Sequence, residues 1–278
     1  MRFIFTCCLL AFSSMAQAED KFITVASTTS TQNSGLYDYL LPQFTQETGI
    51  EVRVVAVGTG QAIKIAKNGD ADVLLVHHRP SEDAFVKDGF GIERRNVMYN
   101  DFVIVGPKND AKLKDLETSL KTFVSSQEYV FVSRGDDSGT HKRERELWQS
   151  YNLAPKGDWY REIGAGMGAA LNMSASVDAY TLSDRGTWLS FGNKGNLHIA
   201  IQGEDSLFNP YGIILVNPAM HPHVKIDMAR QFSDWMVSDR TQSIIGNFTI
   251  NGMQLFCPNA HPEENIDVVC PSSIPKID

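Results

Sequence analysis

The chain contains 278 residues, of which 42% are hydrophobic and 21% are charged, and its formal net charge at pH 7 is −8. This length is enough for one large domain or two medium-sized domains. The acidic balance provides no long-range attraction for nucleic acid or for anionic lipid, so neither is expected as a partner. Any site for an anion must therefore be built from local dipoles and one or two specific cations.

The first eighteen residues (1–18) predict a secretory signal peptide. Arg2 gives a positive start, an apolar run over residues 3–12 follows, and Ala16-Gln17-Ala18 is typical of a cleavage site. The apolar run is far too short to cross a bilayer as a helix. We therefore predict an exported protein whose mature chain begins near Glu19. Cleavage removes one positive charge, which changes the formal net charge from −8 to −9.

Two of the four cysteines, Cys7 and Cys8, lie within the predicted signal peptide. The mature chain keeps Cys257 and Cys270. An even pair in an exported protein predicts a disulfide, and two buried thiols are the alternative. A loop of this size stabilises the fold by roughly 3 kcal/mol in the chain-entropy model.

Beyond the signal peptide, strand-like and helix-like patterns alternate. Strands are predicted at residues 22–26, 50–57, 71–76, 96–107, 129–132, 160–163, 178–182, 197–202 and 211–216. Helices are predicted at residues 36–49, 61–68, 81–89, 115–126, 142–151, 164–173, 183–191, 223–238 and 241–248. This alternation predicts an α/β fold with mostly parallel sheets. At least three strand-to-helix turns are rich in hydroxyls or glycine, and two facing lobes would bring them onto one ligand.

The first such turn contains five hydroxyl residues in succession, Ser27-Thr28-Thr29-Ser30-Thr31. Hydroxyls donate hydrogen bonds without carrying charge, and the start of a helix favours an anion. One or two of them could simply cap the helix, but five exceed what a cap requires. The second turn, Gly58-Thr59-Gly60, has a similar character but is a weak signal alone, because many strand-to-helix turns look like this.

The third predicted strand ends in His77-His78. Neighbours on an extended chain point to opposite faces, and no cysteine or histidine at ligand spacing accompanies the pair. A metal site is therefore not predicted. Instead, we expect one of the two imidazoles to donate a hydrogen bond at a ligand cleft.

The most informative stretch is the loop between the strand at 129–132 and the helix at 142–151. It supplies one guanidinium, Arg134, two hydroxyl donors, Ser138 and Thr140, and glycines that let backbone N–H groups approach a ligand. The loop lies at the carboxyl end of a strand, where α/β sheets bind ligands.

Simpler interpretations of the same loop stay open. Ser138 or Thr140 could only cap the next helix, and Arg134 could only pair with Asp136 or Asp137. The order Gly-Asp-x-Ser-Gly also resembles the loop of a serine hydrolase with Ser138 as nucleophile. However, no histidine and aspartate accompany it in a recognisable pattern.

In these motifs the chain resembles the tungstate-binding periplasmic proteins of ABC importers. The resemblance covers essentially the whole mature chain, and the stretch from Ser133 to His141 is its most specific part. It implies a type II periplasmic binding fold, in which two lobes are joined by crossover strands near Tyr99–Phe102 and Asn209–Ile213. Lobe I would comprise residues 19–100 and 212–278, and lobe II residues 101–211.

The resemblance also implies a function. The protein would be a monomeric binding component, not an enzyme, without a cofactor or bound metal. It would capture tungstate, or molybdate, in the periplasm and deliver it to a membrane permease. The oxyanion ligands that carry over are Thr28, Thr29, Thr59, Gly60, Arg134, Ser138 and Thr140. Asp136 would orient Arg134 rather than touch the anion.

His77 is the residue that separates this chain from the related phosphate-binding proteins. Those proteins share the Arg-x-Asp-x-Ser-Gly-Thr pattern but use an aspartate at the position aligned with His77, where it accepts the proton of phosphate. Tungstate, molybdate and sulfate carry no proton near pH 7, so a donor suits them better than a carboxylate. Molybdate, sulfate and phosphate remain alternatives to tungstate at this point. Ser27 replaces the threonine that many family members have, so its role is left open.

Overall fold

The computed structural model describes residues 21–108, 113 and 115–261. The predicted signal peptide and Cys270 lie outside these residues. The strands are β1 (Phe22–Thr28), β2 (Glu51–Val57), β3 (Val73–Val76), β4 (Gly91–Pro107), β5 (Phe131–Ser133), β6 (Tyr160–Glu162), β7 (Thr181–Asp184), β8 (Leu197–Ile201), β9 (Phe208–Val216), β10 (Thr249–Ile250), β11 (Met253–Gln254) and β12 (Cys257–Pro258). The helices are α1 (Thr29–Asn33), α2 (Leu36–Thr48), α3 (Thr59–Lys67), α4 (Arg79–Lys87), α5 (Leu116–Ser126), α6 (Gly139–Ser150), α7 (Met167–Val177), α8 (Arg185–Ser190), α9 (Ile226–Met236) and α10 (Asp239–Gly246), with a 3-10 turn η1 (Asp205–Leu207).

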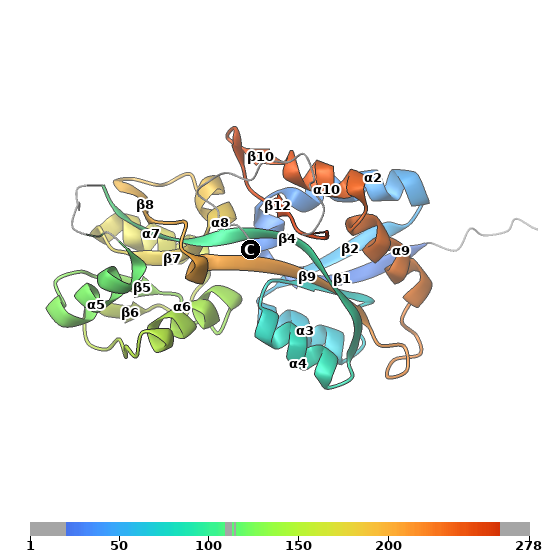
Figure 1. Ribbon diagram of the computed structural model, residues 1–278, viewed down its shortest axis with the longest axis horizontal. Coiled ribbons are helices and arrows are strands. Elements are labelled where there is room, and N and C mark those ends of the chain that lie inside the picture. Colours follow the sequence, from blue (N-terminus) through green and yellow to red (C-terminus); the bar gives the residue numbers. More distant parts are fainter. Residues whose placement is uncertain (1–20, 109–112, 114, 262–278) are drawn as a thin grey trace, which may run out of the picture.

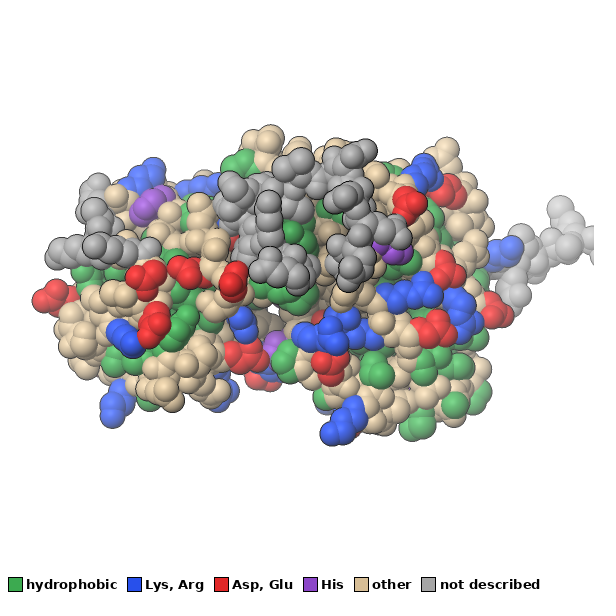
Figure 2. Space-filling view, viewed as in Figure 1, with side chains coloured by type: hydrophobic (Ala, Val, Ile, Leu, Met, Phe, Trp, Pro, Cys, Tyr) green, Lys and Arg blue, Asp and Glu red, His purple; other side chains and the backbone are tan. Residues whose placement is uncertain are grey.

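The elements form two groups joined by the two longest strands (Figure 1). The first lobe contains β1 to β3 with α1 to α4, α9 and α10, and the second contains β5 to β8 with α5 to α8. Strands β4 and β9 run between them, and the surface is hollowed between the two groups (Figure 2). Within the described part of the chain, no helix has the length and apolarity needed to cross a membrane.

The sheet topology explains how the two groups are connected. Strand β1 pairs in parallel with β2 and β3, and β5 pairs in parallel with β6. Strand β9 runs antiparallel to β3 and β4, and the β4–β9 register extends from Gly91↔Val216 to Asp101↔Phe208. From Phe102 onward, β4 pairs with β7 and β8 instead. The α/β class is confirmed, and β4 changes partners within Tyr99–Phe102, although the lobe boundaries themselves stay a prediction.

Strand β4 is longer than its sequence suggests. It begins at Gly91 rather than Asn96, because Gly91 and Ile92 already pair with β9 and pairing resumes at Arg95 after a register shift at Glu93-Arg94. Gly91 itself fits where a side chain would not, since a Cβ there would lie 2.5 Å from the Phe85 ring. Strand prediction relies on apolar alternation, and these charged residues interrupt it, so the sequence does not predict the first part of β4.

Two other boundaries differ from prediction. Asp178 does not start a strand: it caps the C-terminus of α7 with φ 50°, and β7 begins at Thr181. The first hydroxyl turn forms a short extra helix, α1, because the Thr28 side chain accepts a hydrogen bond from Thr31 N–H. By contrast, Asp115 caps α5 and Gly49 ends α2 in the left-handed conformation, as the sequence indicates.

A buried ion pair lies where β4 passes from one lobe to the other. The Asp101 carboxylate accepts from Arg185 Nε at 2.5 Å and from Nη2 at 2.6 Å, and Arg185 also donates to Gln202. Burial raises the pKa of Asp101, against the lowering effect of Arg185. Removing one partner of such a pair leaves an uncompensated buried charge, which typically costs about 3–5 kcal/mol. The pair therefore fixes α8 against the crossing strand.

The second lobe contains a buried carboxyl, Glu144 on α6, beneath an aromatic cluster. Its Oε1 accepts from Trp148 Nε1 at 3.1 Å and from the Tyr160 hydroxyl at 2.7 Å. Burial raises the pKa of Glu144 to about 7, although these hydrogen bonds oppose the rise. Because the pKa is lower in the unfolded chain, ionisation of Glu144 destabilises the fold increasingly as the pH rises from about 4 to above 7.

We predict that Glu144→Gln, which keeps an acceptor oxygen and cannot ionise, is more stable than the parent protein at pH 8 by roughly 2–4 kcal/mol. At pH 5 the two proteins should differ little, because Glu144 is then protonated. Urea unfolding at both pH values measures the difference. Glu128→Gln, at an exposed position of the same lobe, is the matched control. A stability difference that does not change with pH would contradict the prediction.

Candidate anion-binding site

Three strand-to-helix turns and the end of β3 meet at one small pocket. The turns lead from β1 to α1, from β2 to α3 and from β5 to α6. The lining residues are Thr28, Thr29, Ser30, Val57, Gly58, Thr59, His77, Arg134, Ser138, Gly139 and Thr140. Seven of the eight predicted site residues are therefore brought together. The eighth, Gly60, is not among the lining residues and lies in the first turn of α3, near the Lys142 ammonium.

The first turn divides its hydroxyls between the pocket and the core. Ser27 is fully buried, donates to Leu75 C=O at 2.7 Å and contacts the Tyr37 hydroxyl. Thr28 lies at the N-cap of α1, with its hydroxyl 3.1 Å from that of Ser30. Ser30 lines the pocket, although the sequence did not single it out. Ser27 faces away because it still belongs to β1, where successive side chains point to opposite sides.

The second turn places an unpaired hydroxyl at the pocket. Thr59 begins α3, is 1% exposed, and its Oγ1 has no hydrogen-bond partner among the described residues. A buried polar atom without a partner is costly, so an unpaired donor at a pocket points to a ligand. Gly139 is packed against this hydroxyl: a Cβ at that position would lie 2.6 Å from Thr59 Oγ1. The absence of a side chain on Gly139 thus lets α6 approach α3.

In the third turn, Asp136 holds two other site residues. Its Oδ2 accepts from Arg134 Nε at 3.1 Å and Nη2 at 2.5 Å, while its Oδ1 accepts from the Ser138 hydroxyl at 2.6 Å. Burial alone would raise the pKa of Asp136, but the hydrogen bonds from Ser138 and the charge of Arg134 lower it overall. Asp136 therefore stays ionised at neutral pH and fixes the guanidinium at the pocket.

The simpler interpretations of this loop are also realised. Ser138 caps α6 by accepting from His141 N–H at 3.3 Å, and Arg134 pairs with Asp136. These roles do not remove either residue from the pocket, since both line it. The Ser138 proton goes to a carboxylate, and the His141 Nδ1 accepts from Asp137 N–H at 3.0 Å. Ser138 therefore lacks the histidine partner that activates a serine nucleophile.

His77 reaches the pocket from the end of β3. It is 5% exposed and stacks on Tyr211 with 4.8 Å between ring centroids. Its Nε2 lies 3.1 Å from Ser30 Oγ, and its Nδ1 lies 2.9 Å from Asn209 Oδ1. Burial lowers the pKa of His77, so the ring is neutral at neutral pH. Asn209 was not predicted, because 132 positions separate it from His77.

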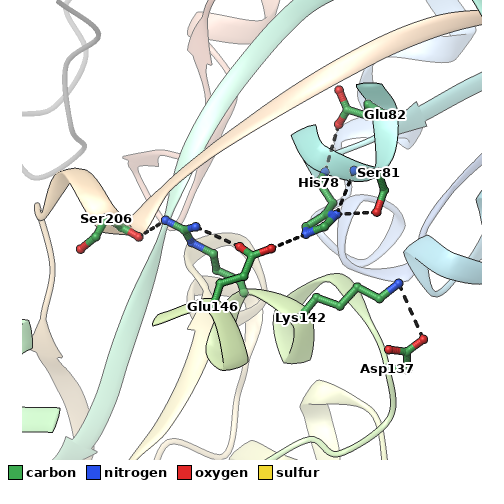
Figure 3. Close-up of polar contacts among 8 residues, drawn as sticks. His78, Ser81, Glu82, Asp137, Lys142, Glu146 and Ser206 are labelled. Carbon is green, nitrogen blue, oxygen red and sulfur yellow. Dashed lines mark hydrogen bonds and ion pairs between the residues drawn. The ribbon is translucent and has the colours of Figure 1, made fainter. Parts of the chain in front are cut away.

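The neighbouring His78 joins the two lobes instead of lining the pocket (Figure 3). Its Nε2 lies 2.9 Å from Glu146 Oε1 on α6, and its Nδ1 lies 2.6 Å from Ser81 Oγ. Arg143 donates to the same Glu146 side chain at 3.1 Å and to Ser206 C=O. Across the described residues, no three His, Cys, Asp or Glu side chains are grouped to hold a metal ion.

Comparison with known proteins identifies the family of this chain. Residues 14–240 match the family model described as PBP superfamily domain. The chain belongs to the PBP superfamily. It is 50% identical over 246 residues to the tungstate-binding protein TupA of Peptoclostridium acidaminophilum, with 86% of each chain covered.

Two solved structures extend the comparison. The tungstate-binding protein TupA from Desulfovibrio alaskensis G20 is 46% identical with a TM-score of 0.76, covering 86% of this chain and 99% of that one. The structure of the tungstate ABC transporter from Geobacter sulfurreducens is 49% identical with a TM-score of 0.75, covering 82% and 98%. The predicted family and fold are thereby confirmed. In the described residues Cys257 is buried in β12, and its pairing with Cys270 stays a prediction.

The contrast between Thr59 and Ser27 gives a stability prediction in the absence of anion. Thr59→Val removes a hydroxyl that has no partner, so the free energy of unfolding should stay unchanged or rise by up to about 1 kcal/mol. Ser27→Ala removes a hydroxyl bonded to Leu75 and Tyr37 and should cost about 1–2 kcal/mol. Chemical denaturation of both variants measures the two changes in the free energy of unfolding. Equal destabilisation by the two changes would mean that the Thr59 hydroxyl has a partner within the fold.

Proposed function

We propose that this protein is the substrate-binding component of an ABC importer and that it captures tungstate, or the closely similar molybdate, in the pocket between its lobes. The observation that carries the proposal is the buried hydroxyl of Thr59, which has no partner in the described part of the chain and lies at a pocket that Arg134 and three helix N-termini also line. The names of the similar proteins support tungstate as the oxyanion.

The anion would be held mainly by dipoles. Arg134 is already paired with Asp136, so the two together add little net charge to the pocket. The starts of α1, α3 and α6 leave backbone N–H groups without intrahelical partners, and such groups favour anions. Hydroxyls of Thr28, Thr29, Thr59 and Thr140 add further donors. Hydrogen bonds to a charged group contribute roughly 1.5–3 kcal/mol each, so several of them support nanomolar binding after the ordering costs.

Two predicted ligands have altered roles in this proposal. The Ser138 hydroxyl donates to Asp136, so Ser138 contributes through its place at the start of α6. Gly60 contributes a backbone N–H in the first turn of α3 and lets the Lys142 side chain approach. Asp136 does not contact the anion but orients Arg134 and Ser138.

The same proposal includes the wider setting of the protein. Export by the signal peptide at 1–18 would place it in the periplasm as a monomer. One lobe would comprise residues 19–100 and 212–278, and the other residues 101–211. The His78–Glu146 contact between the start of α4 and α6 would then help to keep the lobes closed over the anion. A permease in the membrane would receive the released oxyanion. Binding alone requires no cofactor and no covalent step.

Calorimetry with tungstate, molybdate, sulfate and phosphate tests the function. We expect tungstate and molybdate to bind most tightly, and Arg134→Ala to weaken tungstate binding at least about ten-fold, because it removes the only cation that lines the pocket among the described residues. Thr59→Val should weaken binding in the same direction. Arg161→Ala, at an exposed position of the second lobe, is the control and should bind as the parent protein does. Unchanged affinity in Arg134→Ala would refute the assigned site.

His77→Asp tests how the pocket distinguishes oxyanions by their proton count. A carboxylate at this position repels a dianion that carries no proton and accepts the proton of hydrogen phosphate. We therefore expect tungstate affinity to fall and the ratio of phosphate to tungstate affinity to rise by about ten-fold or more. Competition between the two anions in the same titration measures the ratio. A ratio equal to that of the parent protein would show that His77 does not determine the preference.

A further inference from the structure

A chain of two buried amides lies behind His77, on the side away from the pocket. His77 Nδ1 is 2.9 Å from Asn209 Oδ1, and Asn209 Nδ2 donates to Asn100 Oδ1 at 2.6 Å. The exposed fractions of Asn100 and Asn209 are 0% and 1%. The two asparagines are partners in the β4–β9 register, so they come from the two strands that run between the lobes. We call His77, Asn209 and Asn100 the amide relay.

The amide relay determines which ring nitrogen of His77 carries the proton. A neutral imidazole has one N–H donor and one acceptor nitrogen, and the partner of one nitrogen fixes the state of the other. With Asn209 Oδ1 towards the ring, Nδ1 carries the proton and Nε2 is an acceptor for the Ser30 hydroxyl. This arrangement leaves Asn100 Nδ2 buried without a hydrogen-bond partner among the described residues.

A half-turn of both amides reverses the relay with little change of shape, because the oxygen and nitrogen of an amide exchange places. Asn100 Nδ2 then donates to Asn209 Oδ1, and Asn209 Nδ2 donates to His77 Nδ1. His77 must carry its proton on Nε2, which donates to Ser30 Oγ. The proton of Ser30 is thereby free to point into the pocket that Ser30 lines.

We propose that Asn209 and Asn100 are positioning residues that hold His77 in the Nε2–H form when an oxyanion is bound, so that the pocket selects ligands without a proton. This inference rests on the proposed function. Tungstate oxygens only accept hydrogen bonds, and they benefit from the proton that Ser30 releases. Hydrogen phosphate must place its own proton on an acceptor. If Nε2 acts as an acceptor, Nδ1 must carry the proton of the ring. The relay then returns to the arrangement in which Asn100 Nδ2 has no partner among the described residues.

Nitrogen-15 NMR of histidine-labelled protein reads the tautomer directly, with His77→Gln to assign the signals among the seven histidines. With tungstate bound, we expect the Nε2 of His77 to show the shift of a protonated ring nitrogen and Nδ1 that of an unprotonated one. Calorimetry on the same sample reports whether tungstate is bound. Bound tungstate with the proton on Nδ1 would overturn the relay alone. Absence of tungstate binding would overturn the proposed function, and the relay with it.

The variant Asn209→Leu keeps the size of the side chain and removes both hydrogen bonds. We expect its tungstate affinity to fall about ten-fold while its affinity for hydrogen phosphate changes less than about two-fold. Asn172→Leu makes the same change at an exposed position of α7 and should leave both affinities as they are. An equal loss for both anions in Asn209→Leu would indicate a merely structural role and contradict the proposal. The NMR measurement uses the unaltered chain and does not depend on how this variant folds.

Discussion

An acidic protein that binds an anion must do so with dipoles, and this constraint organises the whole pocket. The formal net charge is −8, and Arg134, a cation that lines the pocket, is paired with Asp136. What remains are hydroxyls and the N–H groups at the starts of three helices, which act at short range. Because their effect falls off within a turn of helix, all three helices must begin at the same place. The fold meets this condition by ending β1, β2 and β5 around one point.

Strands β4 and β9 connect the lobes and also support the site. At the crossing, Asp101 is bonded to Arg185, while the adjacent Asn100 pairs with Asn209 behind His77. A shift of either strand would therefore change the contacts of a pocket residue. The contact between His78 and Glu146 joins the start of α4 to α6. The contact between the lobes and the hydrogen bonding of the pocket thus involve the neighbouring residues His78 and His77.

Close packing at the cleft depends on small residues. Gly139 has no room for a Cβ against Thr59, and Gly212 on β9 has none against Glu82, which pairs with Arg94 at 2.8 Å. Both positions let charged or polar groups approach a backbone without an intervening side chain. The sequence indicates only that the glycines of the loop before α6 let backbone N–H groups approach a ligand. In the fold, Gly139 and Gly212 lie in helix α6 and strand β9, and their role is close approach.

The sequence by itself determined the features that depend on neighbouring residues: the α/β class, the caps of α2 and α5, and the location of the polar turns at helix starts. It also placed Thr28, Thr59 and Arg134 in candidate binding turns, because the chemistry of a strand-to-helix turn is local. Only the tertiary structure decided that Ser30 rather than Ser27 lines the pocket. Asn100 and Asn209 join the site from strands 109 residues apart. Such choices depend on strand pairing and side-chain direction in three dimensions, which no local pattern encodes.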